Sequence, residues 1–169
     1  MDTSKDSQDR FKVITLDDPL QMPLLLPFVE EGVKRGSLQL SISPEDYVRN
    51  LLIARLSNGQ VAIYGVYDNI LQRIAAICIL AGGGFNPTIW IEYFAQDKSY
   101  TKYNISELLF AEVMKELWKL GINKVWMMTR KKGLAKRLVT KGKAKPEGLV
   151  LSVEVRRWVE EENPKVNKR

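Results

Sequence analysis

The sequence has no histidine and a single cysteine, Cys78, and both shortages limit the chemistry open to the protein. Without histidine there is no Ser-His-Asp or Cys-His catalytic centre, no imidazole metal ligand and no histidine proton shuttle. One cysteine excludes a disulfide within the chain and a zinc site made of cysteines, and it indicates a reducing compartment. Cys78 lies between Ile77 and Ile79, which predicts a buried structural thiol. Any catalysis therefore depends on carboxylates, lysines, tyrosines, hydroxyl groups and the backbone.

Long hydrophobic runs are also missing. The longest strictly apolar run, Ile74 to Ala81, is far shorter than a membrane span, and the polar N-terminus has no signal-peptide character. We therefore expect an intracellular, cytoplasmic protein with no membrane partner. The 169 residues, 45% of them hydrophobic, suit one globular domain. We assign residues 1–10 to a flexible tail, 11–158 to the single domain and 159–169 to a polar tail.

The first half of the chain alternates between helix and strand signals. Phe11, Val13 and Ile14 indicate a short strand, and a helix is expected over Leu24–Val33. Ser43 followed by a proline and two acidic residues predicts a helix start, which an apolar period of three to four residues continues to Leu56. Three runs rich in β-branched and aromatic residues then predict an antiparallel meander, with Gly82 to Gly84 in a hairpin loop: Val61–Tyr67, Leu71–Leu80 and Thr88–Ala95.

The second half begins with the strongest helix signal. Asn104 and Glu107 resemble a capping box, the apolar stripe continues to Leu120, and Gly121 ends the helix. A buried strand over Lys124–Thr129, a short basic helix over Gly133–Lys141 and a last strand over Leu149–Trp158 follow. The predicted order is β-α-α-β-β-β-α-β-α-β, which defines one mixed α/β domain without a repeat or an internal linker.

Positive charge is concentrated towards the C-terminus. Residues 1–100 hold 9 basic and 12 acidic side chains, whereas residues 101–169 hold 17 basic and 8 acidic ones. The basic segment, residues 130–145, contains eight lysines and arginines and no acid. It predicts an anionic partner, and three remain open: a phosphate of a cofactor, nucleic acid bound without sequence specificity, or an acidic protein surface. A plain solvated surface is the structural alternative.

This order of elements resembles that of the GNAT family, the Gcn5-related N-acetyltransferases, most closely from Trp90 to Thr129. The resemblance implies a GNAT-like mixed sheet and acetyl-CoA as cofactor, with no metal. It places the cofactor at the end of the fourth strand, in the loop that follows it and after the fifth strand. The matching residues are Phe94, Ala95, Gln96, Ser99, Thr101, Lys102, Tyr103, Asn104, Lys131 and Lys132. The loop lacks the glycines that the family uses to approach the pyrophosphate.

The resemblance also implies a carboxylate on the fourth strand as catalytic base, and Glu92 matches it. Strand alternation places Glu92 on one face with Trp90 and Phe94, where an apolar environment would raise its pKa. The structural alternative is a salt bridge to an arginine on a neighbouring strand, such as Arg73.

Two functions remain open at this point. The first is a divergent N-acyltransferase that transfers an acetyl group directly from acetyl-CoA to an amine. The second is a catalytically degenerate structural or interaction protein. No tyrosine follows Tyr103, so the tyrosine that the family uses as general acid is missing, which favours the second. The chain is also similar to divergent GNAT-like proteins of tailed bacteriophages, which would imply a role in the virion or the host cytoplasm. The sequence leaves the acceptor and the oligomeric state undetermined.

Overall fold

The computed structural model describes residues 10–83, 86–128, 136, 138–141, 143–147 and 150–154. They form one seven-stranded mixed sheet with the strand order β1-β2-β3-β4-β5-β7-β6. The strands are β1 (Phe11–Thr15), β2 (Val61–Asp68), β3 (Arg73–Gly83), β4 (Asn86–Gln96), β5 (Lys124–Met127), β6 (Ala144–Glu147) and β7 (Val150–Glu154). The mixed α/β class and the predicted meander are confirmed, because β1 to β4 pair antiparallel in succession.

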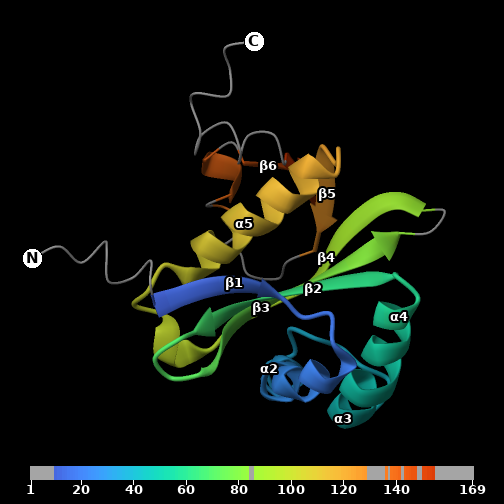
Figure 1. The fold of residues 1–169 in the computed structure, drawn as a ribbon. Coiled ribbons are helices and arrows are strands. Elements are labelled where there is room, and N and C mark those ends of the chain that lie inside the picture. Colours follow the sequence, from blue (N-terminus) through green and yellow to red (C-terminus); the bar gives the residue numbers. More distant parts are fainter. Residues whose placement is uncertain are drawn as a thin grey trace, which may run out of the picture.

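Helices cover both faces of the sheet (Figure 1). On one face lie η1 (Pro19–Leu25), α2 (Leu26–Lys34), α3 (Pro44–Asp46), η2 (Tyr47–Leu52) and α4 (Ile53–Ser57), and on the other lies α5 (Ile105–Lys119). The short 3-10 helix η3 (Lys98–Tyr100) precedes α5. The predicted helix over Leu24–Val33 corresponds to α2 from Leu26 onwards, and its first two residues belong to the preceding 3-10 helix η1.

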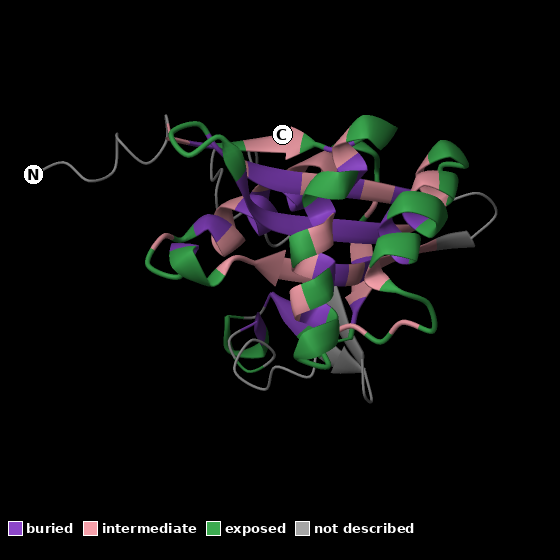
Figure 2. Cartoon of the chain, turned by 90° about the horizontal axis from the view of Figure 1, so that it is seen from below, coloured by how far each residue is buried: buried purple, intermediate pink, exposed green. Residues whose placement is uncertain are grey.

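Each face of the sheet has its own core. Leu109, Val113 and Met114 of α5 pack on one face together with Cys78, whereas Val29, Leu52 and Ile77 belong to the core on the other face. Strand β3 lies between the two layers, and its residues from Ile74 to Leu80 are all buried. This explains the long apolar run in the sequence, since a strand covered on both faces needs no polar side. Figure 2 shows the buried middle of the sheet behind the exposed outer sides of the helices.

Helix α2 approaches β4 closely at Gly32. A Cβ atom at this position would collide with the ring and hydroxyl group of Tyr93, and that hydroxyl donates a 2.8 Å hydrogen bond to the Phe28 carbonyl. The glycine therefore lets the helix lie directly against the second half of β4. This contact places α2 beside the end of the strand on which the predicted site residues lie.

The C-terminal part differs from the prediction. One last strand was expected over 149–158, but the chain forms an antiparallel pair, β6 and β7, and β7 pairs with β5. The sequence Ala-Lys-Pro-Glu of β6 has a charged and proline-containing composition that is atypical of strands, so only pairing with β7 reveals it. Residues 149 and 155–158 of the predicted strand lie outside the described residues, as do residues 133–135 and 137 of the predicted basic helix.

Candidate functional site

Strands β4 and β5 separate halfway along β4. They pair in parallel over only three residues, from Ile89 opposite Val125 to Ile91 opposite Met127. From Tyr93 to Gln96, β4 pairs with β3 alone among the described residues. The edge of β4 that faces away from β3 is therefore open over its last five residues.

The backbone groups on this open edge can be identified by alternation. The Asp97 amide donates to the Ala75 carbonyl of β3, so the N–H and C=O of Ala95 also point towards β3. Those of Phe94 and Gln96 consequently point the opposite way, into the gap between β4 and β5. An extended ligand that carries amide groups could pair with them as an additional strand does.

The separation begins at a β-bulge. Tyr93 pairs with Ile79 and Ile91 pairs with Leu80, so Glu92 is an extra residue without a partner in β3. The bulge reverses the alternation: Ile91 lies in the core beneath α5, whereas Tyr93 lies in the core beneath α2. Because Phe94 packs on the α5 face, stacked on Phe110 at 4.6 Å, the prediction that Glu92 and Phe94 share a face is wrong.

The bulge directs Glu92 towards η2 and α4, where its carboxylate accepts three hydrogen bonds. Arg55 donates from both terminal nitrogens at 2.8 and 2.7 Å, and the Tyr47 hydroxyl donates to Oε1 at 2.8 Å. Burial raises the pKa of Glu92, but the hydrogen bonds and the positive charge of Arg55 outweigh it, so the pKa lies below its ordinary value. The predicted raised pKa is therefore wrong. A salt bridge is present, and its arginine is Arg55 on α4 instead of Arg73 on β3.

The loop after β4 is tightly folded without any glycine. The Tyr100 amide donates to the Asp97 carbonyl, the Thr101 amide to Lys98 and the Tyr103 amide to Tyr100. Ser99 donates from both its amide and its hydroxyl to the Asp97 carboxylate, each at 2.8 Å. Four amides of the loop are thus engaged in hydrogen bonds within the protein.

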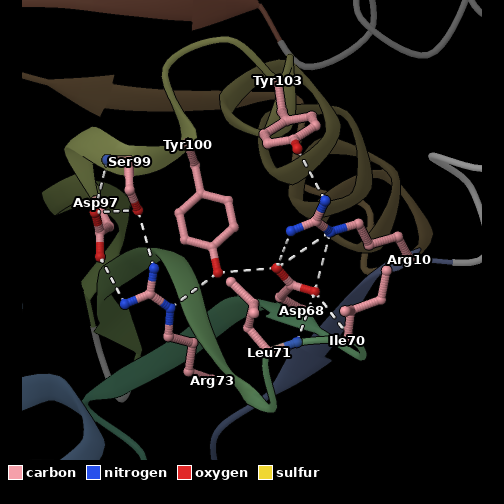
Figure 3. A network of polar contacts seen from close by, with 9 residues as sticks. All are labelled: Arg10, Asp68, Ile70, Leu71, Arg73, Asp97, Ser99, Tyr100 and Tyr103. Atoms are coloured by element: carbon pink, nitrogen blue, oxygen red, sulfur yellow. Dashed lines mark hydrogen bonds and ion pairs between the residues drawn. The ribbon is translucent and has the colours of Figure 1, made fainter. Parts of the chain in front are cut away.

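A buried carboxylate anchors this loop to the sheet (Figure 3). Asp68, at the end of β2, is fully buried and accepts hydrogen bonds from Arg10 at 2.8 Å and from the Tyr100 hydroxyl at 2.9 Å. The amides of Ile70 and Leu71 donate to its other oxygen. The hydrogen bonds from Arg10 hold the pKa of Asp68 far below its ordinary value, against the effect of burial. One ionised carboxylate therefore connects the N-terminal segment, the β2–β3 turn and the β4–α5 loop.

The first turn of α5 has no side-chain cap. Asn104 donates to Glu107 at 2.7 Å and makes no capping hydrogen bond, so the predicted capping box is wrong. Its backbone ψ of 37° departs from the extended conformation in which a cap residue reaches the helix amides. The first three amides of α5 have no acceptor within the helix and lie beside the open end of β4, where Ser106 donates to Gln96.

The predicted cofactor residues therefore fall into distinct groups. Phe94, Ala95 and Gln96 end β4, and Thr101 and Lys102 are exposed in the turn before α5. The polar groups of Ser99 and Tyr103 are engaged with Arg73 and Arg10. Lys131 and Lys132 lie outside the described residues.

Only part of the basic segment is described, and it is not uniformly exposed. Lys141 pairs with Glu107 of α5 at 3.2 Å, whereas Lys143 is buried. Cys78 is buried as predicted, and burial raises its pKa to about 12. Within the described part of the chain, no group of three metal-ligating side chains occurs. No helix there is long and apolar enough to cross a membrane.

A cavity of about 680 Å³ lies on the α2 face of the same strand end. Its walls come from η1 and α2 on one side and from β2, β3, β4 and the start of η3 on the other. Phe94, Ala95 and Gln96 line it, so it reaches the open end of β4. Glu92 is not among its lining residues.

Sequence reasoning missed the partners that hold the site together: Arg55, Tyr47, Asp68 and Arg10. Tyr47 and Arg55 lie eight residues apart on the same helical stretch, about two turns, which places them on one side of it. That spacing is a signal for a shared partner, but it does not identify Glu92. Asp68 falls between the predicted strands Val61–Tyr67 and Leu71–Leu80, and nothing in the neighbouring residues indicates that it is buried.

Comparison with known proteins identifies the same architecture. A family model described as Acetyltransferase (GNAT) domain matches residues 5–133, more than half of the chain. No curated protein matches the sequence.

Among solved structures, the PaiA N-acetyltransferase of Thermoplasma acidophilum in complex with coenzyme A is similar, with a TM-score of 0.63 and 15% identity over 85% of this chain and 98% of that one. A predicted acetyltransferase of Clostridium acetobutylicum with acetyl-CoA has a TM-score of 0.64 and 14% identity, with 81% and 91% covered. The ribosomal-protein-S5-alanine acetyltransferase of Vibrio fischeri has a TM-score of 0.66 and 12% identity, with 88% and 95% covered. At these identities the likeness concerns the fold.

Proposed function

The chain belongs to the GNAT acetyltransferase domain family, and on that premise we propose that it is an acetyl-CoA-dependent N-acetyltransferase with direct transfer to an amine. The observation that carries the proposal is the separation of β4 from β5 at the Glu92 bulge, beside the uncapped start of α5. This arrangement offers an open strand edge and an anion-binding helix end next to each other. Both suit a ligand that has an amide-containing arm and a diphosphate.

The open edge suits the arm of coenzyme A. That arm is an extended chain with two amide groups, and the backbone groups of Phe94 and Gln96 that face the gap can pair with such amides. Pairing to backbone atoms does not depend on side-chain identity, so it tolerates a divergent sequence. It would leave the thioester near the bulge, where Glu92 interrupts the strand.

The start of α5 suits the diphosphate. Backbone amides at a helix N-terminus and the helix dipole favour an anion, and the exposed Lys102 adds a positive charge beside them. The fit is less complete than with a glycine-rich loop, because Ser99, Tyr100, Thr101 and Tyr103 use their amides within the protein. We assign the diphosphate to the α5 amides and to Lys102.

We assign the base to Glu92. In the reaction, the amine nitrogen bonds to the thioester carbonyl carbon, the carbon–sulfur bond breaks, and the sulfur leaves as the thiol of coenzyme A. The substrate enters as an ammonium ion, which passes one proton through water to Glu92 and then to solvent; a second proton goes to the thiolate, and the third stays on the amide nitrogen. Arg55 and Tyr47 keep the carboxylate ionised, so its titration lies below neutral pH and the amine's own ionisation sets the pH dependence above it.

Calorimetry with coenzyme A and acetyl-CoA tests the cofactor assignment. We expect Lys102→Gln to weaken binding about three- to tenfold, because one exposed charge contact is lost. Lys34→Gln is the matched control, since Lys34 is also exposed but lies at the end of α2, outside the residues assigned to the cofactor. Equal affinities of wild type and both variants would contradict the assignment of Lys102. An absence of binding to the wild type would contradict the cofactor.

Turnover measurements test Glu92. We expect Glu92→Gln to lower kcat at least about a hundredfold, the range of general acid–base catalysis, with the affinity for acetyl-CoA unchanged. Tyr47→Phe is the control, because it removes one hydrogen bond and keeps the charge pair with Arg55. If both variants lose activity in proportion to their loss of stability, the role of Glu92 is structural.

The glycine-free loop and the missing tyrosine favour a second function. A protein of this fold that has lost its chemistry would act as an interaction module, with the basic segment turned towards an anionic partner. This alternative predicts no stabilisation by millimolar acetyl-CoA in a thermal unfolding experiment, because a ligand bound to the native state must raise Tm by mass action. A clear rise in Tm would exclude it.

A further inference from the structure

The cavity beside α2 has walls that suit a flat, apolar group. Three aromatic residues that pack on the α2 face line it: Phe28, Tyr67 and Tyr93. Pro23, Leu24, Pro27 and Ile74 add aliphatic surface. A volume of about 680 Å³ is within the range of small-molecule sites, which are mostly apolar with a few placed polar groups.

The charged residues that line the cavity have a net positive charge. Arg35, Arg73 and Lys98 face Glu31 and Asp97, which leaves one excess positive charge. Glu31 is shared between Arg35 and Lys98, so its negative charge is already matched. Asp97 is likewise engaged, since both the amide and the hydroxyl of Ser99 donate to it.

Arg73 is the cation that is best prepared for a ligand. Its Nε donates to the Tyr100 hydroxyl and one terminal nitrogen donates to Ser99, each at 3.0 Å. The remaining terminal nitrogen lies 3.7 Å from Asp97, too far for a hydrogen bond. Figure 3 shows the guanidinium between these three groups, and its carbon lies 5.1 Å from the centre of the Tyr100 ring.

The anchoring explains why this arginine holds its position although its side chain is 47% exposed. Tyr100, which accepts from Arg73, itself donates to the buried Asp68. The guanidinium is thus connected to the core through two hydrogen bonds. A fixed planar guanidinium loses little freedom on binding and matches the geometry of a carboxylate.

We propose that this cavity binds a small molecule that combines a ring-sized apolar body with a carboxylate, and that Arg73 receives the carboxylate. The aromatic walls hold the body, and the excess positive charge distinguishes the acid from its neutral or amine analogues. If the molecule is also the acetyl acceptor, it is an amine that carries a carboxylate, and this extension alone rests on the proposed function.

Binding of two matched probes tests the site without any enzymatic readout. 3-Phenylpropionate and 3-phenylpropanamide have the same body, and only the first has a negative charge. In NMR titrations of the full chain we expect the acid to bind about tenfold more tightly than the amide, as one charge-assisted contact predicts. Equal affinities, or no binding of the acid, would overturn the proposal.

Two kinds of variant locate the carboxylate. Arg73→Gln should abolish the preference for the acid, whereas Arg49→Gln, at an exposed pair with Glu45 outside the cavity, should leave it unchanged. Since Arg73 also supports the β4–α5 loop, a second comparison uses the half-exposed Leu24. Leu24→Glu should reduce the preference for the acid about threefold and Leu24→Gln should not, because the two variants differ only in charge. A preference that survives both Arg73→Gln and Leu24→Glu places the carboxylate elsewhere and contradicts the proposal.

The outcome is independent of the cofactor. If the protein binds the acid but not acetyl-CoA, the proposed site is supported and the proposed acetyltransferase function is contradicted. If it binds acetyl-CoA but shows no preference for the acid, the proposed function is supported and the proposed site is contradicted.

Discussion

At the scale of single residues, Asp68 makes more contacts that stabilise the fold than its sequence context predicts. It is fully buried, ionised and bonded to Arg10, Tyr100 and two backbone amides. We expect Asp68→Asn to lower the free energy of unfolding by about 2–4 kcal/mol, since it leaves the Arg10 guanidinium partly buried without its counter-charge. Urea denaturation monitored by fluorescence measures this loss.

The exposed Asp17 supplies the control for that measurement. Asp17→Asn should change the free energy of unfolding by less than about 0.5 kcal/mol, as is usual for surface substitutions. A loss at Asp68 that is no larger than at Asp17 would mean that the network in Figure 3 contributes nothing to stability. The β4–α5 loop would then need another anchor.

For Glu92, the sequence predicts the strand position but not the residues that surround the side chain. Its position on β4 was predictable, because the surrounding residues are aromatic and β-branched. Its surroundings were not. A bulge adds one residue to a strand and reverses the alternation after it, and nothing in Trp-Ile-Glu-Tyr-Phe marks that insertion. The error in the face led directly to the error in the pKa.

At the scale of elements, two helix starts with similar sequence signals differ in structure. The Ser43 hydroxyl accepts a 3.0 Å hydrogen bond from the Asp46 amide, whereas Asn104 makes no such bond. We therefore expect Ser43→Ala to lower the free energy of unfolding by about 1 kcal/mol and Asn104→Ala by less than about 0.5 kcal/mol. Chemical denaturation of both variants checks the difference. Equal losses would show that Asn104 does cap α5 in solution.

At the scale of the whole molecule, the missing histidine makes a specific prediction about pH. Asp68, Glu31, Glu92, Asp97 and Glu107 all have pKa values lowered in the folded chain. A lowered carboxyl pKa stabilises the fold above the unfolded-state value of about 4, and that stabilisation is lost as the pH falls below it. With no imidazole to titrate, we expect stability to be nearly constant from about pH 6 to pH 8.

Denaturation across pH measures both parts of this prediction. Between about pH 5 and pH 3, Asp68 alone should remove about 1 kcal/mol, and this share should disappear in Asp68→Asn. A transition between pH 6 and pH 8 would contradict the expectation, as would an acid limb that is unchanged in the variant.

The sequence by itself determined the mixed α/β class, the antiparallel meander, the long helix after it and the chemistry that the absent histidine excludes. These features follow from local period, composition and turn residues, which depend on neighbours along the chain. Tertiary structure alone decided that Glu92 meets Arg55, that Asp68 is buried beneath Tyr100 and that β6 pairs with β7. These contacts join residues that are distant in sequence, or they depend on one inserted residue in a strand. Neither kind of feature can be predicted from the pattern of neighbouring residues.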